Sequence, residues 1–261
     1  MRANKKSIGE PNQRPAGVRT NAGGLHHHRR GLRGQVMQMP GSNRTVLDLA
    51  AALAAGRTSS RELVEAALAR IADTDGEGSR TFVAVYADTS RAAADAQDRL
   101  RKAGYVASPL AGLPVSVKDL FDVAGERTLA GSKALDDAPP AAHDAPTIAR
   151  LRAAGAVLIG RTNMTEFAFS GVGINPHYGT PGNPYDRRPI PGGSSSGAAV
   201  SVADGQAVTA IGTDTGGSVR IPAGFCGIAG FKPTQSRSRG TESCRCPQHW
   251  IRLAPLLLSV G

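Results

Sequence analysis

The sequence predicts an α/β fold in which a largely parallel or mixed sheet is layered against helices. The main observation is that short apolar strands alternate with helical segments from residue 108 onward. Apolar residues make up 40% of the chain, which is enough to form a sizeable core. The 32 glycines suit this fold class, in which many tight turns join strands to helices.

Helix-start signals define the first elements. Thr45 with Asp48 resembles an N-terminal cap, and Ser59 with Glu62 forms a capping box. Apolar residues then recur at helical spacing, and Gly104 closes a third helix. The predicted elements in chain order are helices at 45–56 and 59–71, a strand at 82–86, a helix at 88–103, a strand at 113–117, a helix at 147–154, a strand at 157–159, a helix that starts at 194 and a strand at 207–212.

The net charge of +10 is confined to the two ends of the chain. Residues 1–44 carry +8 and residues 235–261 carry +3, so residues 45–234 carry −1. Residues 1–44 have no apolar period, and we predict that they form a disordered basic leader. The nearly neutral middle does not favour a basic groove for nucleic acid.

Membrane insertion, disulfides and metal sites are not predicted either. No run approaches the roughly 18 apolar residues of a membrane span, and the N-terminus lacks the apolar segment of a secretory signal. The three cysteines, Cys226, Cys244 and Cys246, form no disulfide framework and no convincing metal site. This cysteine usage favours a reducing, cytoplasmic location.

Three polar stretches interrupt the apolar pattern. In Gly112-Leu-Pro-Val-Ser-Val-Lys118-Asp a lysine ends an apolar strand, where it either reaches the surface or is buried and acts as a base. Pro191-Gly-Gly-Ser194-Ser-Ser-Gly places three serines directly before a helix. In Gly212-Thr-Asp-Thr-Gly-Gly-Ser-Val-Arg-Ile-Pro a Gly-Gly turn presents a serine, and the turn's amides can form a nest for an anion.

Together the three stretches resemble the amidase signature family. With Gly-Phe-Lys-Pro-Thr234 they carry a resemblance that covers roughly residues 45–234. Lys118 lies 76 residues before Ser194, and Ser194 lies 24 residues before Ser218; both spacings fit the family. The resemblance implies a mixed sheet covered by helices on both faces, with residues 45–234 as a partial catalytic domain that is incomplete at its C-terminus.

The resemblance also implies the chemistry. In this family the serine matching Ser218 is the nucleophile, the serine matching Ser194 follows a cis peptide bond and relays protons, and the lysine matching Lys118 is the base. Such a centre hydrolyses carbon–nitrogen amide bonds of a small amide substrate through an acyl-enzyme, without a metal or an organic cofactor.

Further roles follow from the same resemblance. The amides of Thr215, Gly216, Gly217 and Ser218 would hold the oxyanion. Met164 and Ser170 belong to a segment that resembles one lining the substrate pocket in the family, and they would contact the substrate. Ser195, Asp214 and Arg220 would support the site; Asp214 and Arg220 flank Ser218, where they form either a supporting ion pair or structural scaffolding.

The last stretch, residues 235–261, departs from the family in composition, and we predict a truncated chain with an atypical tail. A slip of reading frame is one hypothesis. If the codons for residues 245–255 are read one base earlier, they can encode Pro-Leu-Ser-Ala-Thr-Leu-Asp-Ser-Ile-Gly-Pro. That segment is close to what the family carries after Lys-Pro-Thr.

Three functions remain open. The chain could be a stand-alone amidase, as a monomer or a homodimer. It could be the amidase subunit of the glutamyl-tRNA amidotransferase, which needs partner subunits. It could also be an inactive fragment that keeps the motifs. Glutaminase activity that depends on partners separates the second from the first, and thermal melting separates the third from both.

Overall fold

The computed structural model describes residues 45–234 and the backbone of residues 253–257. All of them belong to one compact unit, Met39–Gly261. The predicted leader, the tail residues 235–252 and 258–261, Cys244 and Cys246 lie outside the described residues. Within the described ranges, no helix is both long and apolar enough to cross a membrane.

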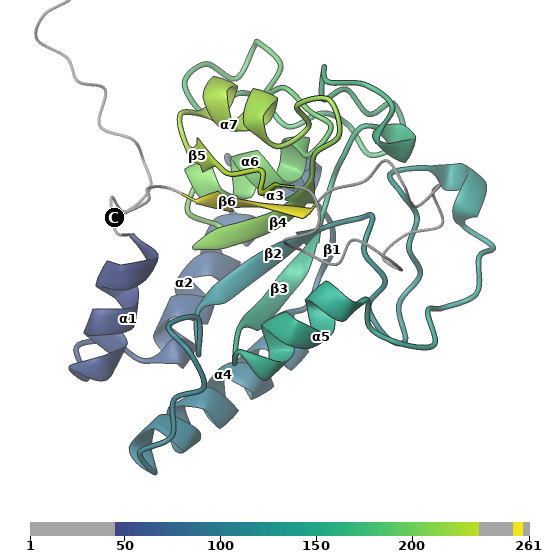
Figure 1. Cartoon of the computed structure of the whole chain (residues 1–261). Helices are drawn as coiled ribbons and strands as arrows, with labels where there is room; N and C mark the ends of the chain where they lie inside the picture. The colour runs from purple at the N-terminus through teal and green to yellow at the C-terminus, as the bar shows by residue number, and fades with distance from the viewer. Residues whose placement is uncertain (1–44, 235–252, 258–261) are drawn as a thin grey trace, which may run out of the picture. The chain divides into compact units, whose positions relative to one another are not determined.

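The elements follow one another as alternating helices and strands through most of the described chain (Figure 1). In chain order they are α1 (Val46–Ala54), α2 (Ser60–Ala72), α3 (Gly78–Thr81), β1 (Phe82–Val85), α4 (Ala87–Lys102), β2 (Pro114–Lys118), the 3-10 helix η1 (Lys133–Leu135), α5 (Pro146–Ala153), β3 (Val157–Thr162), the 3-10 helix η2 (Glu166–Ala168), α6 (Ser196–Ala203), β4 (Thr209–Thr213), α7 (Arg220–Cys226), β5 (Ala229–Gly230) and β6 (Leu253–Leu257).

The six strands form one mixed sheet in the order β1-β3-β2-β4-β6-β5. Its centre is parallel, because β2 pairs in parallel with both β3 and β4. The outer strands run the other way: β1 is antiparallel to β3, and β6 is antiparallel to β4 and β5. The predicted mixed sheet is therefore confirmed. Since β2 and β4 are parallel neighbours, their carboxyl ends meet at the same edge of the sheet.

Helices cover both faces of the sheet (Figure 1). On one face, Val115 and Val117 of β2 and Leu158 of β3 pack against α5. On the other, Val157 and Ile159 of β3 pack against α2 and α4. This alternation follows from the two-residue period of a strand. Because both faces are covered, every residue of β2 and β3 is buried, which is typical of parallel strands at the centre of an α/β sheet.

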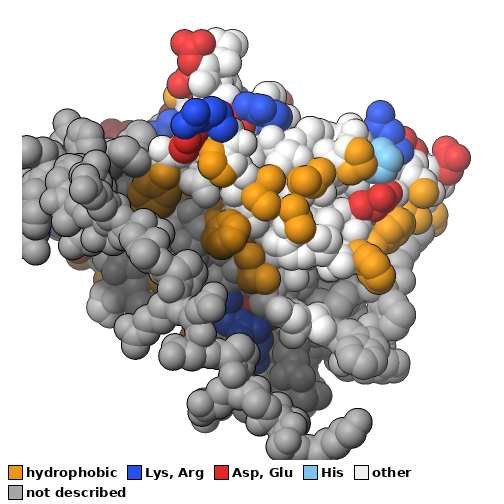
Figure 2. All heavy atoms as spheres, turned by 90° about the horizontal axis from the view of Figure 1, so that it is seen from above, with side chains coloured by type: hydrophobic (Ala, Val, Ile, Leu, Met, Phe, Trp, Pro, Cys, Tyr) orange, Lys and Arg blue, Asp and Glu red, His pale blue; other side chains and the backbone are white. Residues whose placement is uncertain are grey.

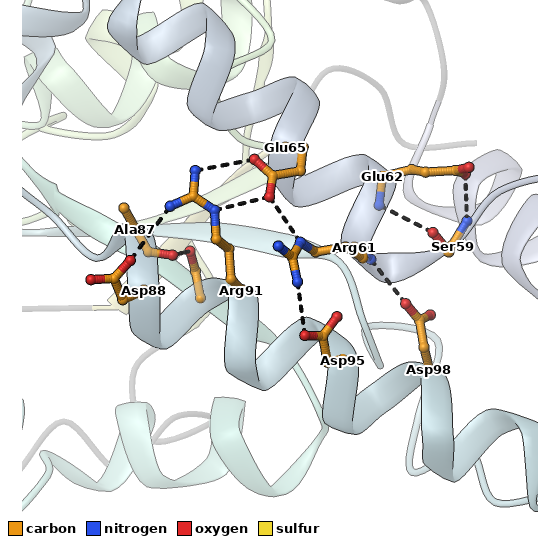
Figure 3. Close-up of polar contacts among 10 residues, drawn as sticks. Ser59, Arg61, Glu62, Glu65, Ala87, Asp88, Arg91, Asp95 and Asp98 are labelled. Atoms are coloured by element: carbon orange, nitrogen blue, oxygen red, sulfur yellow. Dashed lines mark hydrogen bonds and ion pairs between the residues drawn. The ribbon is translucent and has the colours of Figure 1, made fainter.

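The long helices α2 and α4 are joined by a polar network (Figure 3). Arg61 of α2 pairs with Glu65 and with Asp95 of α4, both at 2.8 Å. Asp98 of α4 accepts hydrogen bonds from the amides of Ser60 and Arg61 at 2.8 and 3.0 Å, so it caps the N-terminus of α2 from outside the helix. Half-exposed ion pairs of this kind contribute about 1 kcal/mol or less each, and we take their main effect to be orientation.

Both N-terminal helices start as predicted. Thr45 and Ser59 are the N-cap residues of α1 and α2, and each forms a complete capping box with the acidic residue three positions later. The helix predicted to start at Ser194 begins instead at Ser196, because the two preceding serines are held in a non-helical conformation. Six elements were not predicted: α3, α7, both 3-10 helices, β5 and β6. Of these, β6 lies in the tail that was predicted to be atypical.

Candidate functional site

A lysine is buried at the end of the central strand β2. The side chain of Lys118 is fully buried, and it lies on the same face of the strand as Ser116, whose hydroxyl is 2.8 Å from the hydroxyl of Ser201 in α6. Lys118 Nζ is 2.7 Å from Ser194 Oγ and 2.8 Å from Thr213 Oγ1. Of the two interpretations that the sequence left open, the buried lysine is confirmed.

Ser194 and Ser195 lie directly before α6, and both are fully buried. The peptide bond between Gly193 and Ser194 is cis, as the family resemblance implied. The Ser195 amide donates to the carbonyl oxygen of Ser218 at 3.1 Å, and the Ser195 hydroxyl donates to the carbonyl oxygen of Thr213 at 3.4 Å. The three polar stretches of the sequence therefore meet where β2 and β4 end and α6 begins.

Asp214 organises the turn that carries Ser218. Its buried carboxylate accepts hydrogen bonds from the backbone amides of Gly217, Val219 and Arg220 at 2.9, 3.1 and 3.2 Å. The predicted ion pair is present, with Arg220 Nη2 2.8 Å from Asp214 Oδ1. Gly217 has a φ of +126°, a conformation that favours glycine, and the turn leaves Ser218 partly exposed. A serine presented in this way is open to a reagent from solvent.

The same turn contains the four residues whose amides were predicted to hold the oxyanion. The Gly217 amide donates to Asp214 at 2.9 Å, so in this conformation its hydrogen is already engaged, and the oxyanion role of Gly217 stays a prediction. The amides of Gly216 and Ser218 make no backbone hydrogen bond within the described part of the chain. Thr215 is exposed and takes part in a further interaction.

The charge of Asp214 should make the stability of this turn depend on pH. Burial raises the pKa of Asp214, but hydrogen bonds from Arg220, Val219 and Gly217 outweigh it and lower the pKa to about 2. A lowered pKa stabilises the folded state above the ordinary value of 3.8, and this stability is lost as the pH falls toward 2. We expect Asp214→Asn to reduce the free energy of unfolding by about 1 to 2 kcal/mol at pH 7, since the partner Arg220 is half-exposed.

Urea denaturation at pH 7 and at pH 3 measures this effect. The difference in unfolding free energy between the wild type and Asp214→Asn should shrink at the lower pH. An equal difference at both pH values would show that the carboxylate charge is not what holds the turn.

A buried ion pair supports the strand end beside Lys118. Arg161 Nε of β3 is 2.7 Å from Asp119 Oδ1, and both side chains are almost completely buried. The second carboxylate oxygen of Asp119 accepts from the amide of Gly131 at 3.1 Å, and Arg161 also donates to the carbonyl oxygen of Phe121. Asp119 directly follows Lys118 in the first polar stretch, but its role could not be predicted from the sequence. Its partner, 42 residues away, could be found only from the fold.

Breaking this pair should destabilise the protein strongly. Asp119→Asn leaves the Arg161 guanidinium buried without a counter-charge, so we expect the free energy of unfolding to fall by about 3 to 5 kcal/mol. The matched control is Asp186→Asn, which removes an exposed pair with Arg188 and should cost less than about 1 kcal/mol. Chemical denaturation of the two variants makes the comparison, and similar losses would contradict the expectation.

The two predicted substrate contacts differ in the structure. Met164 is fully buried and packs with Leu120 and Ala130. In this conformation the Met164 side chain is part of the buried core, and its contact with a substrate stays a prediction. Ser170 is partly exposed, and its Oγ accepts from the amide of Val172 at 3.2 Å. Ser170 stays a candidate.

An apolar surface adjoins the Ser218 turn. Figure 2 shows hydrophobic side chains spread over the face that is uppermost in Figure 1, where α7 lies. The exposed Phe225 belongs to α7, and Gly171, two residues after the 94% exposed Phe169, lies against Ile221 of the same helix. A side chain added at Gly217 would meet Ile221 of α7 within 3.0 Å, so the apolar face reaches the turn itself. Any group that approaches Ser218 from this side meets a largely apolar surface.

A sequence model of the family Amidase matches residues 62–247 of the chain. The AtzE subunit of the 1-carboxybiuret hydrolase of Pseudomonas sp. (strain ADP) is 50% identical over 191 residues, which are 72% of this chain and 42% of that protein. The A subunit of the glutamyl-tRNA(Gln) amidotransferase of Chromohalobacter salexigens is 49% identical over 195 residues, or 75% of this chain and 40% of that protein. The chain thus spans about two fifths of the length of these relatives.

A solved structure gives the same picture. The native peptide amidase from Stenotrophomonas maltophilia superposes with a TM-score of 0.75 at 36% sequence identity. The match covers 84% of this chain and 46% of that one. The described sheet and helices are therefore those of one part of a larger fold of this kind.

Proposed function

The chain belongs to the Amidase family, and from this we propose that it hydrolyses carbon–nitrogen amide bonds of a small amide through an acyl-enzyme on Ser218. The observation that carries the proposal is the 2.7 Å contact between Lys118 Nζ and Ser194 Oγ, both fully buried beside the turn that presents Ser218. An amine buried in this way, beside a hydroxyl, is suited to take a proton from it.

In the first half of the proposed reaction, protons shift from Ser218 to Ser194 and from Ser194 to Lys118. Neutral Lys118 accepts the proton of the Ser194 hydroxyl, and Ser194 accepts that of Ser218. The Ser218 oxygen then attacks the amide carbonyl carbon. The tetrahedral oxyanion is held by backbone amides of the turn, of which those of Gly216 and Ser218 make no other backbone hydrogen bond in the described chain.

The second half of the reaction returns the proton. The carbon–nitrogen bond breaks as the proton passes from Lys118 through Ser194 to the leaving nitrogen. Water then adds to the ester on Ser218 and releases the acid. Of the supporting residues, Asp214 and Arg220 shape the turn, and Ser195 links it to α6 through backbone contacts. Ser170 is retained as a substrate contact.

The experiment that tests the proposal is covalent trapping. A phosphonofluoridate reacts with an activated serine and leaves a stable phosphonate ester. We expect mass spectrometry of the labelled 261-residue chain to find one adduct, on the peptide that contains Ser218. A cooperatively melting chain that carries no adduct, or an adduct on another serine, would contradict the proposed centre.

A second candidate function is the amidase subunit of an aminoacyl-tRNA amidotransferase. The identity of 49% with the A subunit of a glutamyl-tRNA(Gln) amidotransferase favours it. Release of ammonia from glutamine by the chain alone, compared with release in the presence of partner subunits, separates the two functions. A requirement for the partners would favour the amidotransferase. A cytoplasmic location, for either function, stays a prediction.

A further inference from the structure

Thr213 ends strand β4 beside the buried lysine. Its side chain is only 3% exposed, and its Oγ1 is 2.8 Å from Lys118 Nζ. The two residues meet because β2 and β4 are parallel neighbours whose carboxyl ends lie at one edge of the sheet. The carbonyl oxygen of Thr213 also accepts from the hydroxyl of Ser195. Thr213 therefore touches the lysine with one oxygen and the segment before α6 with the other.

An amine can take a proton from a hydroxyl only if its lone pair points at that hydroxyl. A lysine side chain has a flexible four-carbon stem, and its terminal amine rotates about the last carbon–nitrogen bond. Burial alone therefore does not fix the direction of the amine's lone pair. A hydrogen bond from Lys118 Nζ to Thr213 Oγ1 fixes one N–H of the nitrogen. The remaining directions on the nitrogen are then set relative to Ser194, 2.7 Å away.

We propose that Thr213 is a positioning residue for Lys118, which orients the amine toward Ser194 and stabilises its protonated form by accepting a hydrogen bond from it. This inference rests on the proposed role of Lys118 as the base. Thr213 acts through Lys118 and touches no substrate. A hydroxyl that accepts from the ammonium favours the charged state, so the same contact also assists the proton transfer.

The charged groups around this pair are already engaged. Asp119, which follows Lys118, is held by Arg161, and Asp214, which follows Thr213, is held by Arg220. Both carboxylates are fully buried. Removing the hydroxyl of Thr213 should therefore change the protonation of Lys118 without releasing either ion pair.

The first test measures the lysine itself. The chain contains six lysines, so a sample labelled with carbon-13 at lysine Cε gives a simple NMR spectrum, and Lys118→Met assigns the Lys118 signal. In Thr213→Val, which keeps the shape and removes the hydroxyl, the titration midpoint of Lys118 should move about one pH unit lower, because the ammonium loses an acceptor. Thr213→Ser, which keeps the hydroxyl, should titrate as the wild type does.

A matched control comes from the other neighbour of β2. Thr162 ends β3 and pairs in register with Lys118, and its buried hydroxyl has no hydrogen-bond partner in the described chain. Thr162→Val therefore removes the same atom from an equivalent place and should leave the Lys118 midpoint unchanged. If Thr162→Val or Thr213→Ser moved the midpoint as far as Thr213→Val, packing rather than the hydroxyl would be responsible, and the proposal would fail.

The second test measures the rate of phosphonofluoridate labelling against pH. Thr213→Val should label Ser218 on the order of tenfold to a hundredfold more slowly at the plateau, and Thr213→Ser should restore the rate. An unchanged titration midpoint together with an unchanged labelling rate in Thr213→Val overturns the role of Thr213. If instead the wild type is not labelled at Ser218, the proposed function fails, whereas the NMR titration still decides whether Thr213 controls Lys118.

Discussion

Replacing Ser218 with alanine is expected to abolish covalent labelling of the chain and any amide hydrolysis. The change removes the atom that would attack the carbonyl carbon, so the remaining groups have nothing to activate. Loss of a serine nucleophile typically lowers turnover by several orders of magnitude, and we expect a fall of about four orders or more. Mass spectrometry after phosphonofluoridate treatment, with turnover of a small amide where it is measurable, makes the comparison.

The matched control is Ser201→Ala. Ser201 is a fully buried serine of α6 whose hydroxyl contacts the hydroxyl of Ser116 and donates to the carbonyl oxygen of Ala198. Its loss should leave labelling at Ser218 in place. Thermal melting of both variants shows whether the fold is kept. Labelling of Ser218→Ala at the wild-type rate would exclude Ser218 as the nucleophile.

The second large effect is expected for Lys118. In the proposed mechanism Lys118 is the base that takes the proton of Ser194. Without its amine, the labelling rate near neutral pH should fall by about 10²- to 10⁴-fold, the usual contribution of general base catalysis. Lys118→Ala tests the role directly. Lys118→Met is the safer variant, since it fills the buried space that alanine would leave empty.

The pH dependence of the loss distinguishes a missing base from a disturbed fold. As the pH rises, hydroxide can replace the amine, so the rate of Lys118→Met should climb with pH while that of the wild type levels off. Lys133→Met, at an exposed position in η1, is the control and should behave as the wild type. A Lys118→Met variant with the wild-type rate and pH profile would remove Lys118 from the mechanism.

Local signals predicted most of the elements that place the site. Both capping boxes mark the true starts of α1 and α2, because the contacts of a box lie within three residues and need nothing from the rest of the chain. The central strands were recognised for a related reason. A strand covered on both faces must be apolar along its whole length, and this shows in the sequence.

Elements without a local signal were missed. Helix α7 contains Pro222 and Gly224 and has no side-chain cap, so its sequence favours a turn. Strand β5 has two residues, too few for any pattern, and it exists because it pairs with β6. For β6 itself, five residues with no alternation gave no reason to predict pairing with β4.

The fold class, the two N-terminal helix starts and the central strands could all be predicted from local patterns in the chain. Lys118, Ser194 and Ser218 became candidates because the three motifs that contain them resemble those of one family. How these residues are arranged in space follows from the folded structure. In the structure Lys118 is buried, and its amine contacts Thr213 and Ser194. The Gly217 amide donates to Asp214, and the Met164 side chain is buried. A strand end or a turn restricts which residue types can occur there, and this restriction is visible in the sequence. The hydrogen bond between Lys118 and Thr213, 95 positions apart, exists only because β2 and β4 pair side by side.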